Sequence, residues 1–141
     1  MDAEVQVTVA GGAEIERSLD IAAARVGDLT DGIYTQLFAQ FPETEALFAL
    51  DRSGQVRGAM LSHLFDAIFD FIGDRRYAHR FIACEIVTHD GYGVAPDAFA
   101  AFFGIVRDQV QAACGAEWTS DMGNAWHALL ADVARYVTAP T

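Results

Sequence analysis

The sequence predicts an all-α domain, and three observations support this fold class. Proline occurs only at positions 42, 96 and 140, so long stretches of the 141-residue chain can form uninterrupted helices. Apolar residues recur at spacings of three and four, which is the period of an amphipathic helix. Only Val5, Val7 and Val9 alternate like a strand, and a lone strand has no partner. We therefore expect an extended arm over residues 1–11 and one domain of about seven helices over residues 12–141.

The first half of the chain accounts for four of these segments. The first helix carries an apolar stripe at Ile15, Leu19, Ala22 and Val26. A second helix covers about residues 30–41, and Pro42 starts a short helical turn that runs to residue 48, because proline is tolerated at a helix start. A polar loop then leads into a long helix with a broad apolar stripe: Val56, Met60, Leu61, Leu64, Ile68, Phe71 and Ile72.

The second half contains three more helices. Residues 77–89 form a shorter helix, and Pro96 starts the next one, which Gly115 ends. Thr119 or Ser120 caps the last helix, and Asp121 in its first turn favours the positive end of the helix dipole.

Composition limits the classes of partner. The net charge is −11, with nine arginines and no lysine, so nucleic acids and anionic membranes are disfavoured. No apolar run is long enough to span a bilayer, and the N-terminus lacks the basic and apolar regions of a signal peptide, so we expect a cytoplasmic protein. Cys84 and Cys114 form no spaced pair, and each lies in a mainly apolar stretch, which predicts buried free thiols.

The four histidines lack the short, regular spacing of a zinc site. Three of them, His63, His79 and His127, are expected at the surface. His89 differs because it ends a predicted helix and is followed by two glycines within four residues. From the residues alone, His89 is either a surface histidine in a turn or a metal ligand at a helix end.

Three segments in order carry a resemblance to a known family. They are "FPETEALF" from residue 41, "THDGYGVAPDAF" from residue 88 and "WTSDMGNAWHALLADV" from residue 118. Together they resemble the single-domain bacterial globins related to flavohaemoglobins, over about residues 15–137. The resemblance implies a globin fold around one haem pocket. Because no CxxCH motif is present, the implied cofactor is a non-covalent haem b.

The resemblance implies roles for four residues around the haem. His89 would be the haem-iron ligand, Phe48 would stack on the haem, and Val94 would press on the macrocycle edge. Phe99 stands where flavohaemoglobins have a tyrosine that strengthens the proximal histidine, and no glutamate lies near the C-terminus. This departure from the family pattern argues against a peroxidase-like electron push.

On the distal side of the haem, the resemblance places Tyr34 over the iron, eight residues before Pro42. Its hydroxyl would donate a hydrogen bond to bound dioxygen, which carries partial negative charge. The alternative is a tyrosine packed in the helical core with its hydroxyl at the edge.

The long helix leaves its register open at the distal position. A gapless register places Val56 there, with Met60 over the haem and Leu64 behind it, whereas Gln55 is the attractive second donor. Met60 could be a sixth iron ligand, although apolar packing is the simpler role. Two arginines are the candidate partners of the haem propionates: Arg57 and Arg52.

The function that follows is reversible binding of a diatomic gas, O₂ first and also NO or CO. NO dioxygenation would need a separate reductase, because the chain carries no flavin domain of the flavohaemoglobin type. The alternatives are a haem-based gas sensor and a haem-free signalling module, and His89 together with Phe48 argues against the second. The resemblance fits either a monomer or a homodimer.

Overall fold

The computed structural model describes residues 11–73 and 96–138. Within these ranges the chain forms helices and loops without a strand, so the all-α prediction is confirmed for them. The elements, in order, are α2 (Gly12–Arg25), α3 (Thr30–Gln40), the 3-10 helix η1 (Pro42–Phe48), α4 (Gln55–Ile72), α6 (Pro96–Cys114), the 3-10 helix η2 (Gly115–Glu117) and α7 (Ser120–Thr138). The arm expected over residues 1–11, apart from Gly11, and the helix expected over residues 77–89 lie outside the described residues.

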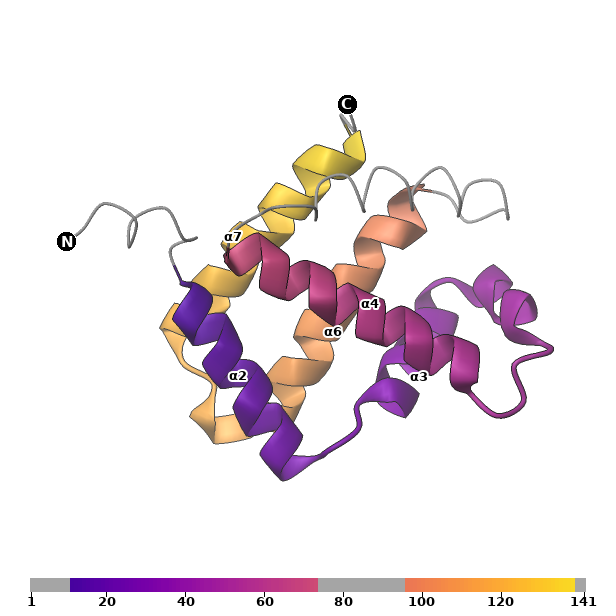
Figure 1. The fold of residues 1–141 in the computed structure, drawn as a ribbon, viewed down its shortest axis with the longest axis horizontal. Helices are drawn as coiled ribbons and strands as arrows, with labels where there is room; N and C mark the ends of the chain where they lie inside the picture. Colours follow the sequence, from indigo (N-terminus) through magenta and orange to yellow (C-terminus); the bar gives the residue numbers. More distant parts are fainter. Residues whose placement is uncertain (1–10, 74–95, 139–141) are drawn as a thin grey trace.

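Helix α6 lies at the centre of the helix packing. It packs against α2, α3 and α7, and α2 also packs against α7. Helix α3 in turn contacts η1 and α4. Figure 1 shows α4 running across the direction of α6 and α7, with η1 at the end of the molecule opposite α2. The described helices thus form two crossed layers that share one core.

That core contains most of the two apolar stripes expected over residues 15–26 and 56–72, together with residues of α3, α6 and α7. Its largest fully buried side chains are Trp126, Tyr34, Phe71, Ile15, Ile33, Ile68, Ile105, Met122, Leu129, Val106 and Val110. Two expected stripe residues are exposed instead. Val26 is 56% exposed because α2 ends at Arg25, one residue before it. Val56 is 52% exposed and lies in the first turn of α4, at the end of that helix farthest from its buried residues.

A fully buried polar group joins three helices at Ser18 of α2. The Ser18 hydroxyl donates to the Ile15 carbonyl at 2.7 Å and accepts the indole N–H of Trp126 from α7 at 2.9 Å. The thiol of Cys114 from α6 donates to the Ser18 carbonyl at 3.3 Å. Each polar atom therefore has a partner, as burial requires. Cys114 is a buried free thiol, as predicted, and burial raises the pKa of its thiol.

Helix α7 begins as the sequence predicts. The Thr119 hydroxyl accepts the Met122 N–H at 3.1 Å, so Thr119 is the capping residue, and Asp121 lies in the first turn. None of the helices in the described ranges has the length and apolarity that a membrane span needs.

We predict that Ser18→Ala destabilises the fold by about 1–3 kcal/mol, because it leaves the buried Trp126 indole N–H without an acceptor. Urea denaturation followed by circular dichroism measures the change in free energy of unfolding. Ser62→Ala provides the control, since Ser62 is an exposed serine within α4. Equal unfolding curves for the Ser18 and Ser62 variants would show that the Ser18 hydroxyl contributes nothing.

Candidate functional site

Four aromatic side chains from three elements meet beside the core. Tyr34 and Phe38 come from α3, Phe48 from η1 and Phe102 from α6. The centroid of the Tyr34 ring lies 5.4 Å from the centroid of the Phe48 ring, and the two rings meet edge to face. The corresponding centroid distances are 5.5 Å to Phe102 and 6.0 Å to Phe38. The ring centroids of Phe38 and Phe48 are 5.7 Å apart, so every ring except that of Phe102 contacts at least two others. We call these four side chains the aromatic cluster.

Polar side chains position α3 on α6 and so place Tyr34 against Phe102. The Gln36 side-chain amide donates to Asp108 at 2.8 Å, and its oxygen accepts the Gln109 amide at 2.8 Å. Asp108 also pairs with Arg107 at 2.7 Å. Since hydrogen bonds are directional and apolar contacts are not, this network fixes how α3 is rotated and shifted along α6.

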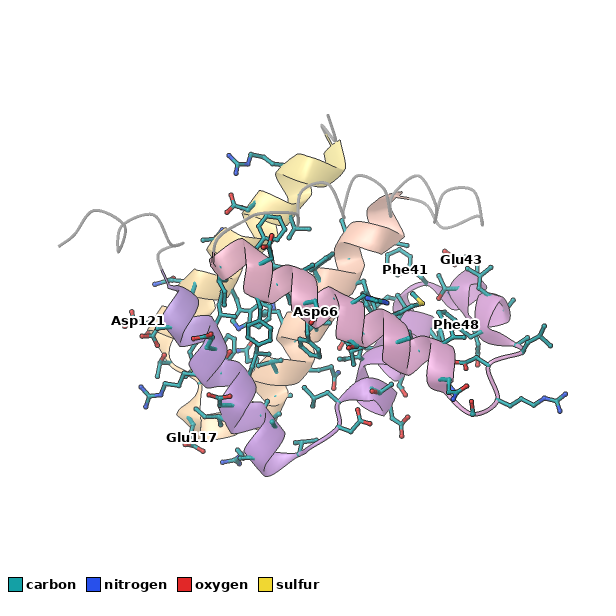
Figure 2. All side chains as sticks on the ribbon, viewed as in Figure 1. Phe41, Glu43, Phe48, Asp66, Glu117 and Asp121 are labelled. Carbon is teal, nitrogen blue, oxygen red and sulfur yellow. The ribbon has the colours of Figure 1, made fainter. Side chains whose placement is uncertain are left out.

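The 3-10 helix η1 brings Phe48 back to α3. Pro42 occupies its first position, and the buried Thr44 hydroxyl donates to the Phe41 carbonyl at 2.7 Å. These features reverse the chain direction directly after α3. Figure 2 shows Phe41, Glu43 and Phe48 at the same end of the molecule, far from Glu117 and Asp121. Phe48 is half-buried, so part of its ring remains available at the edge of the cluster.

The hydroxyl of Tyr34 is the polar group within this cluster. Tyr34 is 2% exposed, and its O–H donates to the backbone carbonyl of Arg57 in α4 at 3.0 Å. Burial raises the pKa of Tyr34 well above its usual value, and the negative charge of Asp51 acts in the same direction while Arg57 opposes it. The hydroxyl therefore stays protonated at any physiological pH and can act as a hydrogen-bond donor.

The first turn of α4 is held by a carboxylate that precedes it. Asp51 accepts the backbone N–H groups of Val56 and Arg57, each at 3.0 Å. The Arg57 side chain donates to the same carboxylate at 3.1 Å and to the Asp51 carbonyl at 3.1 Å. Gly54, at a φ of +81°, lets the chain turn back between them. We call this group of contacts the Asp51–Arg57 clamp.

The environment of Asp51 stabilises its charged form. The side chain is only 5% exposed, and burial by itself would raise its pKa. The Val56 N–H and then the N–H groups and charge of Arg57 act against that effect, and they hold the pKa of Asp51 below its ordinary value. The clamp is therefore fully formed at neutral pH.

The predicted distal-side residues of α4 differ in their surroundings. Leu64 is buried at 4% exposure and Met60 is half-buried. Gln55 and Val56 are both exposed, so burial does not favour either one as the distal residue. The choice between them stays open.

The two arginines proposed for the propionates also differ. The guanidinium of Arg57 is paired with Asp51, whereas Arg52 is exposed in the loop before α4. An anion that engages Arg57 would therefore have to share it with the clamp.

Most of the predicted proximal side lies outside the described residues. This holds for His89 and Val94, and also for two residues with other predicted positions, His79 and Cys84. Phe99 belongs to α6, but its side chain is outside the described set as well. His63 and His127 are exposed, as predicted. Among the described residues, no group of three or more histidine, cysteine, aspartate or glutamate side chains could hold a metal ion.

Sequence reasoning missed three residues of the site, Phe38, Phe102 and Asp51. Phe102 stands next to Phe103, which is buried in the core. The position of Phe102 beside Tyr34 depends on the contact between α3 and α6. Asp51 does not follow the usual capping pattern, because the N-cap of α4 is Gly54 and Asp51 precedes it in the loop. Its contact with the first N–H groups of α4 depends on the turn at Gly54.

The chemistry of the cluster suits a flat, apolar ligand better than a polar substrate. Aromatic rings supply broad apolar faces, and one buried O–H supplies a donor that can select a small polar group. A macrocycle stacked beside Phe48 would satisfy the first feature, and a diatomic ligand near Tyr34 would use the second.

Comparison with known proteins gives one match. The family model described as Globin matches residues 31–137, more than half of the chain. The matched region contains every residue of the aromatic cluster and of the Asp51–Arg57 clamp. No match is found among curated proteins or among solved structures.

The low pKa of Asp51 predicts how the stability of α4 depends on pH. A carboxylate with a lowered pKa stabilises the fold above its unfolded value, about 3.9, and that stabilisation is lost as the pH falls through the folded value. Asp51→Asn should therefore be less stable than the wild type at pH 7 and should lose less stability on acidification.

Denaturant unfolding between pH 7 and pH 2.5 measures this dependence. Asp66→Asn is the control, because Asp66 is an exposed carboxylate in the middle of α4 (Figure 2), and it should follow the wild-type curve. A wild-type and an Asp51→Asn curve that run parallel at all pH values would contradict the prediction.

Proposed function

The chain belongs to the globin family, and on that premise we propose that it binds one haem b and reversibly binds a diatomic gas, O₂ first and also NO or CO. The aromatic cluster is the observation that carries the proposal. In this cluster, Phe48, the predicted haem-stacking residue, contacts Tyr34, the predicted ligand-contacting residue. Their ring centroids are 5.4 Å apart. These two residues come from α3 and η1, which lie in the matched region.

Three residues of this chain would hold the haem. His89 would bind the iron through a neutral imidazole, Phe48 would stack on the macrocycle, and Val94 would pack against its edge. Haem supplies an iron centre that takes a diatomic gas reversibly. Arg52, which is exposed, and Arg57, which is shared with Asp51, would face the propionates.

Tyr34 would determine which gas is held. Its hydroxyl is protonated, buried and surrounded by apolar rings, so a hydrogen bond from it is little weakened by water. O₂ gains more from such a donor than CO, because bound O₂ carries more negative charge. This preference supports O₂ as the main ligand.

NO dioxygenation is a second candidate function, because the same donor would retain O₂ until NO arrives. This activity, like a closer relation to flavohaemoglobins, is part of the proposal, and turnover would need a separate reductase. Mixing the O₂-bound protein with NO in a stopped-flow instrument tests it. Rapid, stoichiometric formation of nitrate supports a dioxygenase, and slow reaction supports a carrier or sensor.

We predict that His89→Ala binds haem weakly or not at all, because the substitution removes the iron ligand. Titration of the purified protein with haem, followed by the visible absorption spectrum, measures binding. Added imidazole should partly restore the spectrum of the variant, since it can replace the lost side chain.

His63→Ala and His127→Ala are the matched controls, because both histidines are exposed in the described helices. Both variants should bind haem like the wild type. A wild type that takes up no haem supports the haem-free signalling alternative. A His89 variant with wild-type haem content and spectrum shows that another residue is the ligand.

We predict that Tyr34→Phe raises the O₂ dissociation rate by roughly tenfold to a hundredfold, because it removes a hydrogen bond of about 1–3 kcal/mol. The ring remains, so packing in the aromatic cluster is almost unchanged. The CO dissociation rate should change much less. Flash photolysis and stopped-flow replacement measure both rates, and an equal shift for the two gases would mean that Tyr34 acts through shape alone.

A further inference from the structure

The donor of Tyr34 is already engaged in the protein. A phenolic hydroxyl carries one proton, and that proton is donated to the Arg57 carbonyl at 3.0 Å. Tyr34 is 2% exposed, so water cannot replace this acceptor without opening the packing around the ring. Donation to a gas ligand must therefore exchange one hydrogen bond for another.

The acceptor in this exchange, the Arg57 carbonyl, belongs to a residue that is bonded to Asp51 through both its backbone and its side chain. The N–H of Arg57 and its side chain both donate to the Asp51 carboxylate, at 3.0 and 3.1 Å. A second side-chain bond reaches the Asp51 carbonyl at 3.1 Å. The backbone of Arg57, including the carbonyl that Tyr34 uses, is thereby fixed to the loop that precedes α4.

We propose that Asp51 is a positioning residue that controls the affinity for polar gases by holding the Arg57 carbonyl in competition with the ligand for the Tyr34 hydroxyl. The inference rests on the proposed function, because it needs Tyr34 to contact the gas. It adds a residue that lies outside the aromatic cluster and acts through Tyr34. A firm clamp favours the bond to Arg57, and a loosened clamp releases the hydroxyl to the ligand.

The competition has a defined direction and size. A net hydrogen bond of about 0.5–1.5 kcal/mol corresponds to roughly a twofold to tenfold change in an equilibrium constant. Asp51→Ala should therefore slow O₂ dissociation by roughly that factor. CO dissociation should stay within about twofold of the wild type, since CO gains little from the hydroxyl.

A second variant tests the same link with less risk to the helix start. Arg57→Leu removes both side-chain bonds of the clamp and leaves the backbone N–H bonds to Asp51 in place. It should shift the O₂ rate in the same direction as Asp51→Ala and by a smaller factor. Asp66→Ala, an exposed carboxylate of the same helix, should leave both gas rates unchanged.

The double variant Asp51→Ala/Tyr34→Phe shows whether the effect passes through the hydroxyl. If it does, Asp51→Ala changes the O₂ rate in the wild-type background and leaves it unchanged in the Tyr34→Phe background. An equal effect in both backgrounds overturns the inference, as does an equal change for O₂ and CO. If Tyr34→Phe is selective for O₂ but Asp51→Ala is not, the inference fails and the proposed function stands. If Tyr34→Phe is itself not selective, the inference fails together with the donor role of Tyr34, whereas the proposed binding of haem and gas is tested separately by haem titration.

A measurement without gas gives an independent readout. In the ligand-free full-length protein, NMR can follow exchange of the Tyr34 hydroxyl proton with solvent. Exchange should be slow in the wild type and in Asp66→Ala, and faster in Asp51→Ala and Arg57→Leu, because the acceptor is then less firmly held. Equal exchange in all four proteins would show that the clamp does not control the hydroxyl.

Discussion

A buried hydroxyl must have an acceptor, and this requirement links the described elements around Tyr34. The ring of Tyr34 packs between α3, η1 and α6, so its hydroxyl has no route to solvent. The first turn of α4 supplies the missing acceptor through the Arg57 carbonyl. A single polar atom thus constrains where α4 begins relative to α3. The loop between η1 and α4 must satisfy that constraint, and Asp51 is the residue of the loop that makes it rigid.

Two kinds of interaction determine this fold: burial of apolar side chains and directional hydrogen bonds. Burial of apolar stripes brings α2, α6 and α7 together but leaves their relative rotation weakly defined. Directional contacts then select one arrangement, through Ser18 beside Cys114 at the C-terminal end of α6 and through Gln36 beside Asp108 and Gln109 of the same helix. The second contact matters for the proposed function, because it fixes how α3, which carries Tyr34, is oriented against α6.

The helices were largely predictable from sequence, because their apolar period and their capping residues are local signals. The starts of η1 at Pro42 and of α7 after Thr119 are examples. The prediction that Val26 belongs to the buried stripe was wrong, because an apolar stripe does not indicate the residue at which a helix ends. Tyr34 and Phe48 were proposed as site residues from family resemblance, and they do lie in contact. Phe102 could not be found, since its place depends on how α3 docks on α6.

The burial of Cys114 has a consequence for measuring the dynamics of this protein. Its thiol is fully enclosed and bonded to the Ser18 carbonyl, 96 residues away in sequence. An alkylating reagent needs the exposed thiolate, so it can modify this sulfur only when α2 moves away from α6. The rate of alkylation, read at Cys114 by peptide mass spectrometry, therefore reports how often these two helices separate. Cys114 is therefore a native probe of that opening, and no label has to be introduced.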